Sequence, residues 1–265
     1  MSLKRTPQTY ASDHNIAALG DTPLDRRNNV AVDMIYRGNT QEAIEELRQL
    51  EAEHPGEYAT AANLGTAYEL AGRNEDALQW INEAIRRDPD SHGGTEWLHV
   101  DILEAKIQAE RDPTFFNAHS VLDLDHRQIH SIDSENIAGG VRRPVKEIGR
   151  AIHHQLQERL TFVKPTDPAV AGLLYDYAAI EAATRSLESA RDLLLMARDF
   201  GYPRSRLDPL LNEYGEIITT AKVRRWIFYG AIVVTAVALI IHSRRRRANG
   251  ATSTAVCTTF CEHHD

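Results

Sequence analysis

The densest group of potential metal ligands in the sequence lies near its C-terminal end. Cys257, Cys261, His263 and His264 place two thiols and two imidazoles within eight residues. Zinc accepts such soft and borderline ligands in tetrahedral geometry. Two adjacent histidines are difficult to bring to one ion, however, and no patterned element surrounds the four residues. We therefore predict a free or disulfide-linked tail, with no metal and no cofactor.

A second candidate region for chemistry is the segment 114–144, which is rich in Asp and His. Long loops in compact domains often carry function, so an enzyme or a metal-binding site in this region is our alternative hypothesis. Its histidines, His119, His126 and His130, would share a face only on a helix, which the local composition disfavours. The chain contains no Walker motif, no HExxH and no GxSxG. We therefore predict a protein that is not an enzyme.

The charges are distributed unevenly along the chain. The net charge is −8, yet residues 222–265 carry +5 and residues 1–221 carry −13. Affinity for nucleic acid comes from clustered Lys and Arg side chains that neutralise phosphates. The acidic body therefore argues against a nucleic-acid partner.

An apolar run of 18 residues extends from Trp226 to Ser243, WIFYGAIVVTAVALIIHS. As a helix it would span roughly 27 Å, close to the hydrocarbon thickness of a bilayer. Aromatic rings and long cationic side chains are favoured at membrane interfaces. The flanking residues of these types are Trp226, Tyr229, Arg244, Arg245, Arg246 and Arg247. We predict a single transmembrane helix at 226–243, with the lipid bilayer as a partner.

The orientation of this span stays open between two alternatives. Four Arg follow the span and three basic residues precede it, which weakly favours a cytosolic C-terminus. The first residues, MSLKRTPQTYASDH, contain no apolar stretch that would direct export. The body is cytosolic if the chain is taken as written, and it faces outward if an export signal is missing.

The remaining chain repeats itself with a period of 34 residues, since residues 24–57 align with 58–91. Val30 matches Leu64, and Ala31 matches Gly65. The second unit carries seven residues at the signature positions of the tetratricopeptide repeat: Leu64, Gly65, Tyr68, Gly72, Ala77, Ala84 and Pro89. The chain therefore resembles that family. The small residues would let two helices approach closely, and Gly38 and Gly72 would each lie in the turn of a helical hairpin.

The resemblance continues beyond the two repeats. Together with Ser91–Lys106, His119–Asp125 and Gln155–Asp176, the repeats resemble a group of bacterial tetratricopeptide proteins of unassigned function. Members usually begin with an export signal, which is absent from this sequence as written. The resemblance implies a fold and a bacterial origin, and it implies no activity.

We predict an all-α fold, a helical-hairpin solenoid with capping helices plus one C-terminal transmembrane helix. Residues 1–22 form an N-terminal lead-in, and residues 23–111 hold the two repeats and a capping helix. Residues 112–144 are an irregular loop with extended pieces near Val121–Leu124, and 145–221 are helical with a degenerate repeat-like hairpin. The transmembrane helix at 226–243 precedes a basic and Cys/His-containing tail at 244–265.

The function implied by this architecture is a membrane-anchored scaffold. Stacked repeats build a concave surface that suits a peptide or helix of another protein. By family position the groove residues are Asn28, Val32, Ile35, Tyr36, Ala62, Asn63, Thr66, Glu69 and Leu70. Relatives that bind a terminal carboxylate use basic residues and Asn, whereas only Asn63 fits such a position here. We therefore expect a partner held by other contacts.

Overall fold

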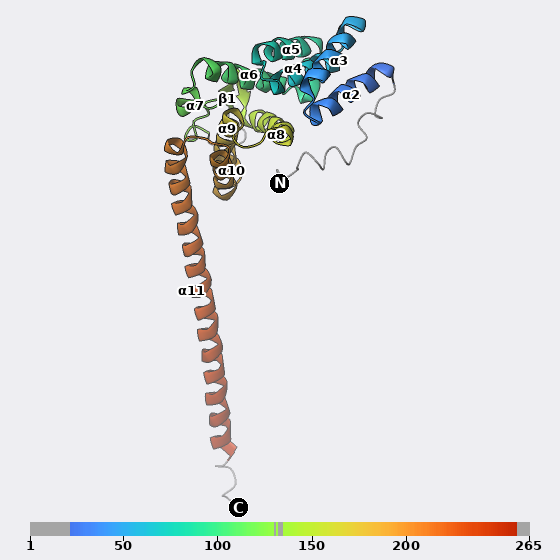
Figure 1. Ribbon diagram of the computed structural model, residues 1–265. Helices are drawn as coiled ribbons and strands as arrows, with labels where there is room; N and C mark the ends of the chain where they lie inside the picture. The colour runs from blue at the N-terminus through green and yellow to red at the C-terminus, as the bar shows by residue number, and fades with distance from the viewer. Residues whose placement is uncertain (1–21, 130, 132–134, 259–265) are drawn as a thin grey trace, which may run out of the picture. The chain divides into compact units, whose positions relative to one another are not determined.

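The computed structural model describes residues 22–129, 131 and 135–258, with side chains described as far as Arg245. These residues hold ten α-helices, one 3-10 turn and one two-stranded sheet (Figure 1). The chain divides into two compact units, Met1–Asn212 and Glu213–Asp265. The predicted all-α solenoid with one long apolar C-terminal helix is confirmed, with a small sheet added.

Two helical hairpins open the first unit. They comprise α2 (Pro23–Tyr36) with α3 (Thr40–Glu53), and α4 (Tyr58–Leu70) with α5 (Asn74–Arg87). Each helix packs against the next along the chain. Gly38 and Gly72 lie in the two hairpin turns at φ +83° and +74°, a left-handed conformation that glycine adopts without steric cost. Their predicted position in the turns is confirmed.

The two hairpins share one apolar core. Leu47, Leu64 and Ile81 are completely or almost completely buried within it. A Cβ atom at Gly65 would lie 2.4 Å from Ile81 Cδ1, so α4 and α5 come closest at this glycine. Burial of such side chains is the main favourable contribution to folding.

A single helix follows the hairpins. The 3-10 turn η2 (Ser91–Gly93) leads into α6 (Glu96–Arg111), which packs against α5 on one side and against α8 and α9 on the other. Leu98, Ile102 and Ala105 form its buried face, as their spacing predicts. The helix thus closes the repeats and connects them to the rest of the first unit.

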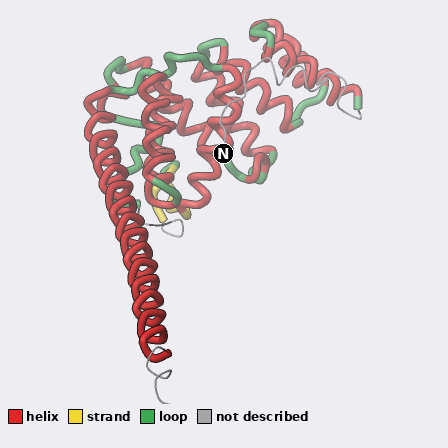
Figure 2. Tube along the Cα trace, turned by 90° about the horizontal axis from the view of Figure 1, so that it is seen from below, coloured by secondary structure: helices red, strands yellow, loops and turns green. Residues whose placement is uncertain are grey.

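The segment 112–144 is more ordered than predicted. It contains α7 (Phe115–Ala118) and an antiparallel hairpin of β1 (Glu135–Ala138) and β2 (Val141–Pro144), drawn in yellow in Figure 2. Gly139 and Gly140 form its turn at φ +59° and +66°, as a tight two-residue turn requires. The prediction of extended pieces at Val121–Leu124 is wrong, since the only strands among the described residues lie at this glycine pair.

Three helices complete the first unit: α8 (Val145–Phe162), α9 (Pro168–Thr184) and α10 (Leu187–Asp199). Asp167 caps α9, since its Oδ1 accepts a hydrogen bond from the Val170 N–H at 2.8 Å. The hairpin of α9 and α10 buries Ala190 and Ala197, the two small residues whose spacing indicated a degenerate repeat. It lies beside α8, which packs on α9.

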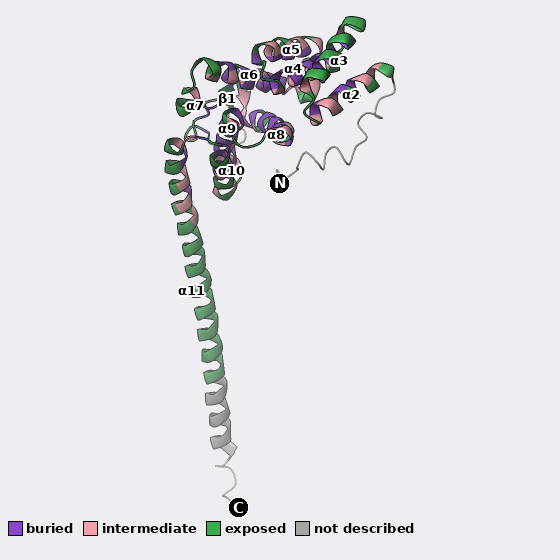
Figure 3. Cartoon of the chain, in the orientation of Figure 1, coloured by how far each residue is buried: buried purple, intermediate pink, exposed green. Residues whose placement is uncertain are grey.

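The last helix, α11 (Arg204–Thr258), includes the apolar run. The helix continues through residues 244–258, so the predicted tail is helical over that part and Cys257 lies within the helix. Cys261, His263 and His264 lie outside the described residues. The apolar side chains are exposed, and Figure 3 shows this stretch in green.

Candidate functional site

A cavity of about 810 Å³ lies on the concave side of the repeats. Its walls come from α2, α4 and α6 and from the C-terminal end of α8. Eight of the nine predicted groove residues line it, namely Val32, Ile35, Tyr36, Ala62, Asn63, Thr66, Glu69 and Leu70. Along α2 and α4 they are one, three or four positions apart, which places them on one broad face of each helix.

The ninth predicted residue, Asn28, does not line this cavity. It is 5% exposed, and its Nδ2 donates to Thr60 Oγ1 at 3.1 Å. Its Oδ1 accepts a hydrogen bond from Asn63 Nδ2 at 3.3 Å. Asn28 therefore joins the first helices of the two repeats.

One wall of the cavity is a feature that the sequence analysis missed. The end of α8 lies across the groove, where Phe162 stacks on Tyr36 with 4.6 Å between the ring centroids. Arg159 reaches from the same helix to Glu69 on α4. No local sequence pattern relates residues so far apart in the chain, so the repeat alone could not predict this wall.

The floor of the cavity holds a buried ionic cluster around Glu69. Its carboxylate accepts hydrogen bonds from Lys106 Nζ at 3.0 Å and Arg159 Nη2 at 3.1 Å, and His99 Nε2 lies at 2.8 Å. Burial opposes ionisation of Glu69, but Arg159, His99 and Lys106 outweigh it and hold its pKa well below the ordinary value. Both cations are thus paired within the protein.

A second carboxylate, Glu96, extends the cluster toward the groove edge. It accepts a hydrogen bond from the Tyr58 hydroxyl at 3.0 Å, and His92 Nδ1 lies 2.9 Å from it. Burial opposes ionisation of Glu96, yet His92 and His99 lower its pKa. In return, the hydrogen bond to Glu96 raises the pKa of His92. Acidic side chains and basic or imidazole side chains therefore alternate along the floor of the cavity, and apolar side chains such as Tyr36 and Phe162 lie above them.

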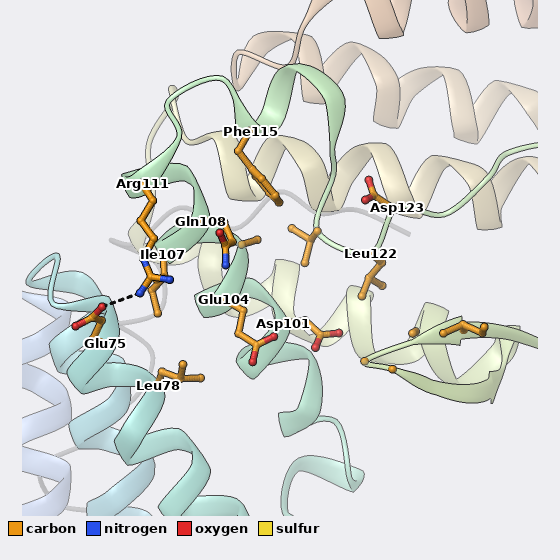
Figure 4. A pocket seen from close by; sticks show the side chains of 16 residues that line it. Glu75, Leu78, Asp101, Glu104, Ile107, Gln108, Arg111, Phe115, Leu122 and Asp123 are labelled. Atoms are coloured by element: carbon orange, nitrogen blue, oxygen red, sulfur yellow. Dashed lines mark hydrogen bonds and ion pairs between the residues drawn. The ribbon is translucent and has the colours of Figure 1, made fainter.

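A second cavity, of about 770 Å³, lies where α6 meets the 114–144 region (Figure 4). Asp101, Glu104 and Asp123 contribute carboxylates, and Arg111 pairs with Glu75 at 3.1 Å. Burial and the neighbouring Glu104 raise the pKa of Asp101 to about 7. The described residues that line this cavity include no His, Cys or Ser, so its titratable groups are the carboxylates and Arg111.

The two described histidines of the 114–144 region have separate neighbours. His119 Nδ1 lies 2.7 Å from Asp123, and His126 packs against the Tyr175 ring. His130 lies outside the described residues. The alternative hypothesis of an enzyme or metal site in this region therefore stays a prediction, with a cavity beside it.

The predicted membrane segment forms part of α11. Over residues 204–245 this helix contains an 18-residue stretch with a mean hydropathy of 2.0, none of which is buried. Trp226 is 75% exposed, Tyr229 is 52% exposed, and Arg244 and Arg245 are exposed as well. The side chains of Arg246 and Arg247 lie outside the described part. The helix is long and apolar enough to cross a membrane.

Comparison with known proteins gives a family match for the repeats. The family model of the tetratricopeptide repeat matches residues 32–92. Among solved structures, the chain is similar to a tetratricopeptide repeat protein from Parabacteroides merdae ATCC 43184, with 15% identity and a TM-score of 0.31 over 78% of this chain and 89% of that chain. A search of the curated proteins finds no match. Residues 32–92 thus match the tetratricopeptide repeat, and this segment extends from within α2 to the second residue of η2, over most of the two hairpins.

Proposed function

We propose that the chain is a membrane-anchored interaction scaffold that holds a peptide or helix of a partner protein in the groove of its repeats. One observation carries this proposal. Eight residues placed in the groove by family position line a single cavity, whose fourth wall at the end of α8 combines apolar Leu160 and Phe162 with the charged Arg159. Arrays of stacked helical hairpins present such concave surfaces to their partners.

The lining indicates what kind of segment fits. Val32, Tyr36, Leu70 and Phe162 offer apolar contact, while the Glu69 cluster offers hydrogen-bonding groups below them. The volume lies within the range of about 300–1,000 Å³ typical of small ligand sites. A short segment with apolar side chains therefore suits the cavity better than a long helix, which would have to displace α8.

The charges of the cluster argue against capture of a free C-terminal carboxylate. Lys106 and Arg159 would be the natural ligands for such a group, because charge-assisted bonds to carboxylates are strong. Both already bind Glu69. A carboxylate from a partner would have to compete with this buried acid, so we expect internal or apolar segments to be preferred.

The membrane part of the proposal rests on the apolar helix. A helix that is apolar on all sides belongs in a core or in lipid, and none of the 18-residue stretch is buried by protein. We propose a single span at 226–243, with Trp226, Tyr229 and the Arg244–Arg247 run at its two interfaces. Such an anchor would confine the groove, and therefore its partner, to a membrane surface.

A matched pair of substitutions on α2 tests the groove. Val32→Arg inserts a long cation into the cavity, whereas Val30, which is 37% exposed, lies on the same helix and outside the lining. We expect full-length chain in detergent to capture the same partner with wild type and with Val30→Arg, and to lose it with Val32→Arg. Thermal melts verify that both variants are folded. Retention of the partner by Val32→Arg and by Ala62→Arg would exclude the groove as its binding site.

A further inference from the structure

A group of three metal-type ligands lies at the edge of the groove, where η2 meets α8. His92, His154 and Glu158 each place one ligand atom within 4.8 Å of the other two. His154 Nε2 lies 3.4 Å from Glu158 Oε1, and His92 Nδ1 lies 4.0 Å from the same oxygen. Their side chains are 40%, 33% and 43% exposed, so the group lies near the surface, with His154 Nε2 itself covered by protein.

We propose that these three residues bind a divalent zinc-class metal ion. Two imidazoles and one carboxylate form a ligand set that zinc uses when one coordination position stays open. With Zn–N and Zn–O bonds of about 2.0–2.2 Å, tetrahedral ligand atoms lie roughly 3.3 Å apart. The distance from His154 to Glu158 already matches this spacing. The longer distance to His92 closes with a small rotation of the half-exposed Glu158 side chain.

The chain holds each ligand toward this point. His154 and Glu158 are four residues apart on α8 and therefore share one face of the helix. His92 has a positive φ of +49°, which is uncommon for a residue with a side chain. Its ring lies edge-on to the His154 ring, with 5.1 Å between the centroids. Its Nδ1 lies 2.9 Å from Glu96 and would exchange this contact for the ion. The three side chains are thus held near one another by the protein, and small side-chain shifts complete the site.

Two further observations favour the binding of a cation by these residues. His154 Nε2 is buried and accepts or donates no hydrogen bond among the described residues, which is costly for a polar atom unless a ligand satisfies it. The carboxylate of the group, Glu158, pairs only with His92 and His154 among the ion pairs of the described chain, and with no Lys or Arg. A divalent ion would give His154 Nε2 a partner and balance the charge of Glu158.

Metal binding at this place would have a mechanical consequence. The ion would connect η2, directly after the second repeat, to α8, whose end forms one wall of the groove. It would hold that wall against the repeats and stabilise the first unit. The inference stands independently of the proposed partner, because it concerns only residues of this chain.

Zinc titration of the full-length chain in detergent tests the site, after removal of metal by a chelator. Because Cys257 and Cys261 could also bind zinc, the parent protein carries Cys257→Ser and Cys261→Ser and no polyhistidine tag. We expect one zinc ion per chain by calorimetry, and visible absorption bands of tetrahedral cobalt when Co²⁺ replaces it. A hundredfold excess of zinc over the Kd should raise the Tm by about 5 °C or more.

Single substitutions then assign the ligands. His92→Ala, His154→Ala and Glu158→Gln should each weaken zinc binding at least about 10-fold, while His153→Ala, the neighbouring residue on α8, should leave it unchanged. If His154→Ala fails to fold, Glu158→Gln still tests the site, because it changes only a half-exposed side chain and should preserve the fold. Failure of the parent to bind zinc at micromolar concentration would overturn the proposal. Binding that survives Glu158→Gln and His92→Ala, or that falls equally with His153→Ala, would overturn it as well.

Discussion

Two helical stretches of this chain are apolar on all sides, and they lie in opposite surroundings. In α9 (Pro168–Thr184), residues such as Leu173, Leu174 and Ala178 have no exposed surface. In the stretch from Trp226 to Ser243, Trp226 is 75% exposed and Val234 is 68% exposed. Figure 3 shows α9 largely in purple and this stretch of α11 in green.

The difference shows that apolar composition alone does not assign a helix to lipid. Helix α9 is covered because α8 and α10 pack against it and because small residues such as Gly172 let other segments approach. It also carries Asp176, whose buried carboxylate binds the 119–125 segment. The stretch at 226–243 has bulky β-branched residues, basic flanks and no internal acid. These are the features that favour a bilayer.

The largest difference between the two helices is expected when a charged residue is inserted into each. Leu174→Asp buries an unpaired carboxylate in protein, so we expect a loss of more than about 4 kcal/mol in the free energy of unfolding and no cooperative melt. Val234→Asp, near the middle of the apolar run, should leave that melt unchanged. It should instead reduce the membrane-bound fraction, since an acid at the centre of a span costs about 2.5–3.5 kcal/mol. Circular dichroism and flotation of full-length chain measure the two effects. An altered melt in Val234→Asp would place the stretch inside the protein core.

The next largest effect is expected at Asp176, the acid that distinguishes α9. Its carboxylate accepts hydrogen bonds from the Ser120 hydroxyl at 2.7 Å and from the N–H groups of Leu122 at 2.9 Å and Leu124 at 3.1 Å. Asp176→Ala leaves these donors buried without an acceptor, which should destabilise the protein by about 3 kcal/mol. Asp176→Asn keeps one acceptor oxygen and should cost less. Urea denaturation at pH 5 measures both, and equal stability of Asp176→Ala and wild type would show that the segment is not held by this residue.

The same acid predicts a dependence of stability on pH. Burial outweighs the three donors and raises the pKa of Asp176 from 3.8 to about 7. The native state therefore keeps a proton that the unfolded chain has already lost, so stability should fall as pH rises from about 4 through 7. Asn does not titrate, so the free energy of unfolding of wild type should fall relative to that of Asp176→Asn between pH 5 and pH 8. If the difference in free energy of unfolding instead grows in favour of wild type over this interval, the raised pKa is contradicted.

Glycine substitutions probe how closely each helix is surrounded. A Cβ atom at Gly172 would lie 3.4 Å from Phe116 Cε1 and from backbone atoms of Ser120 and Val121, whereas one at Gly230 has nothing within 4 Å. Gly172→Leu should therefore overpack the core and cost about 1–3 kcal/mol. Gly230→Leu should change the melt of the first unit by less than about 0.5 kcal/mol. Thermal melts in detergent measure both substitutions. Equal losses of stability would show that Gly172 and Gly230 are equally closely surrounded by protein.

Features encoded by local spacing could be predicted from the sequence. The 34-residue period and the turn glycines Gly38 and Gly72 each depend on the spacing of residues along one or two neighbouring hairpins. The hairpin of β1 and β2 was also signalled, since Gly139 and Gly140 separate residues such as Ile137 and Val141 that suit strands. We predicted an irregular loop because Gly139, Gly140, Pro144 and the scattered Asp, Ser and His are all typical of loops.

Features that depend on distant segments could not be predicted. Arg159 pairs with Glu69 across 90 positions of the chain, and Asp176 binds Leu122 across 54. The i, i+4 spacing of His154 and Glu158 was visible, but nothing local indicated that His92 would join them. For the groove, the family position placed eight residues around one cavity, while their role in binding a partner stays a prediction.

The central claim, that the exposed apolar stretch belongs in lipid and the preceding residues fold without it, can be tested by deletion of 226–265. Full-length chain should sediment with membranes and resist extraction by alkaline carbonate. The deletion variant should remain in the supernatant after ultracentrifugation, with a strongly helical circular-dichroism spectrum and a cooperative melt. If the variant aggregates or loses its helicity, or if the full-length chain is released by carbonate, the stretch is part of the fold and the membrane assignment is wrong.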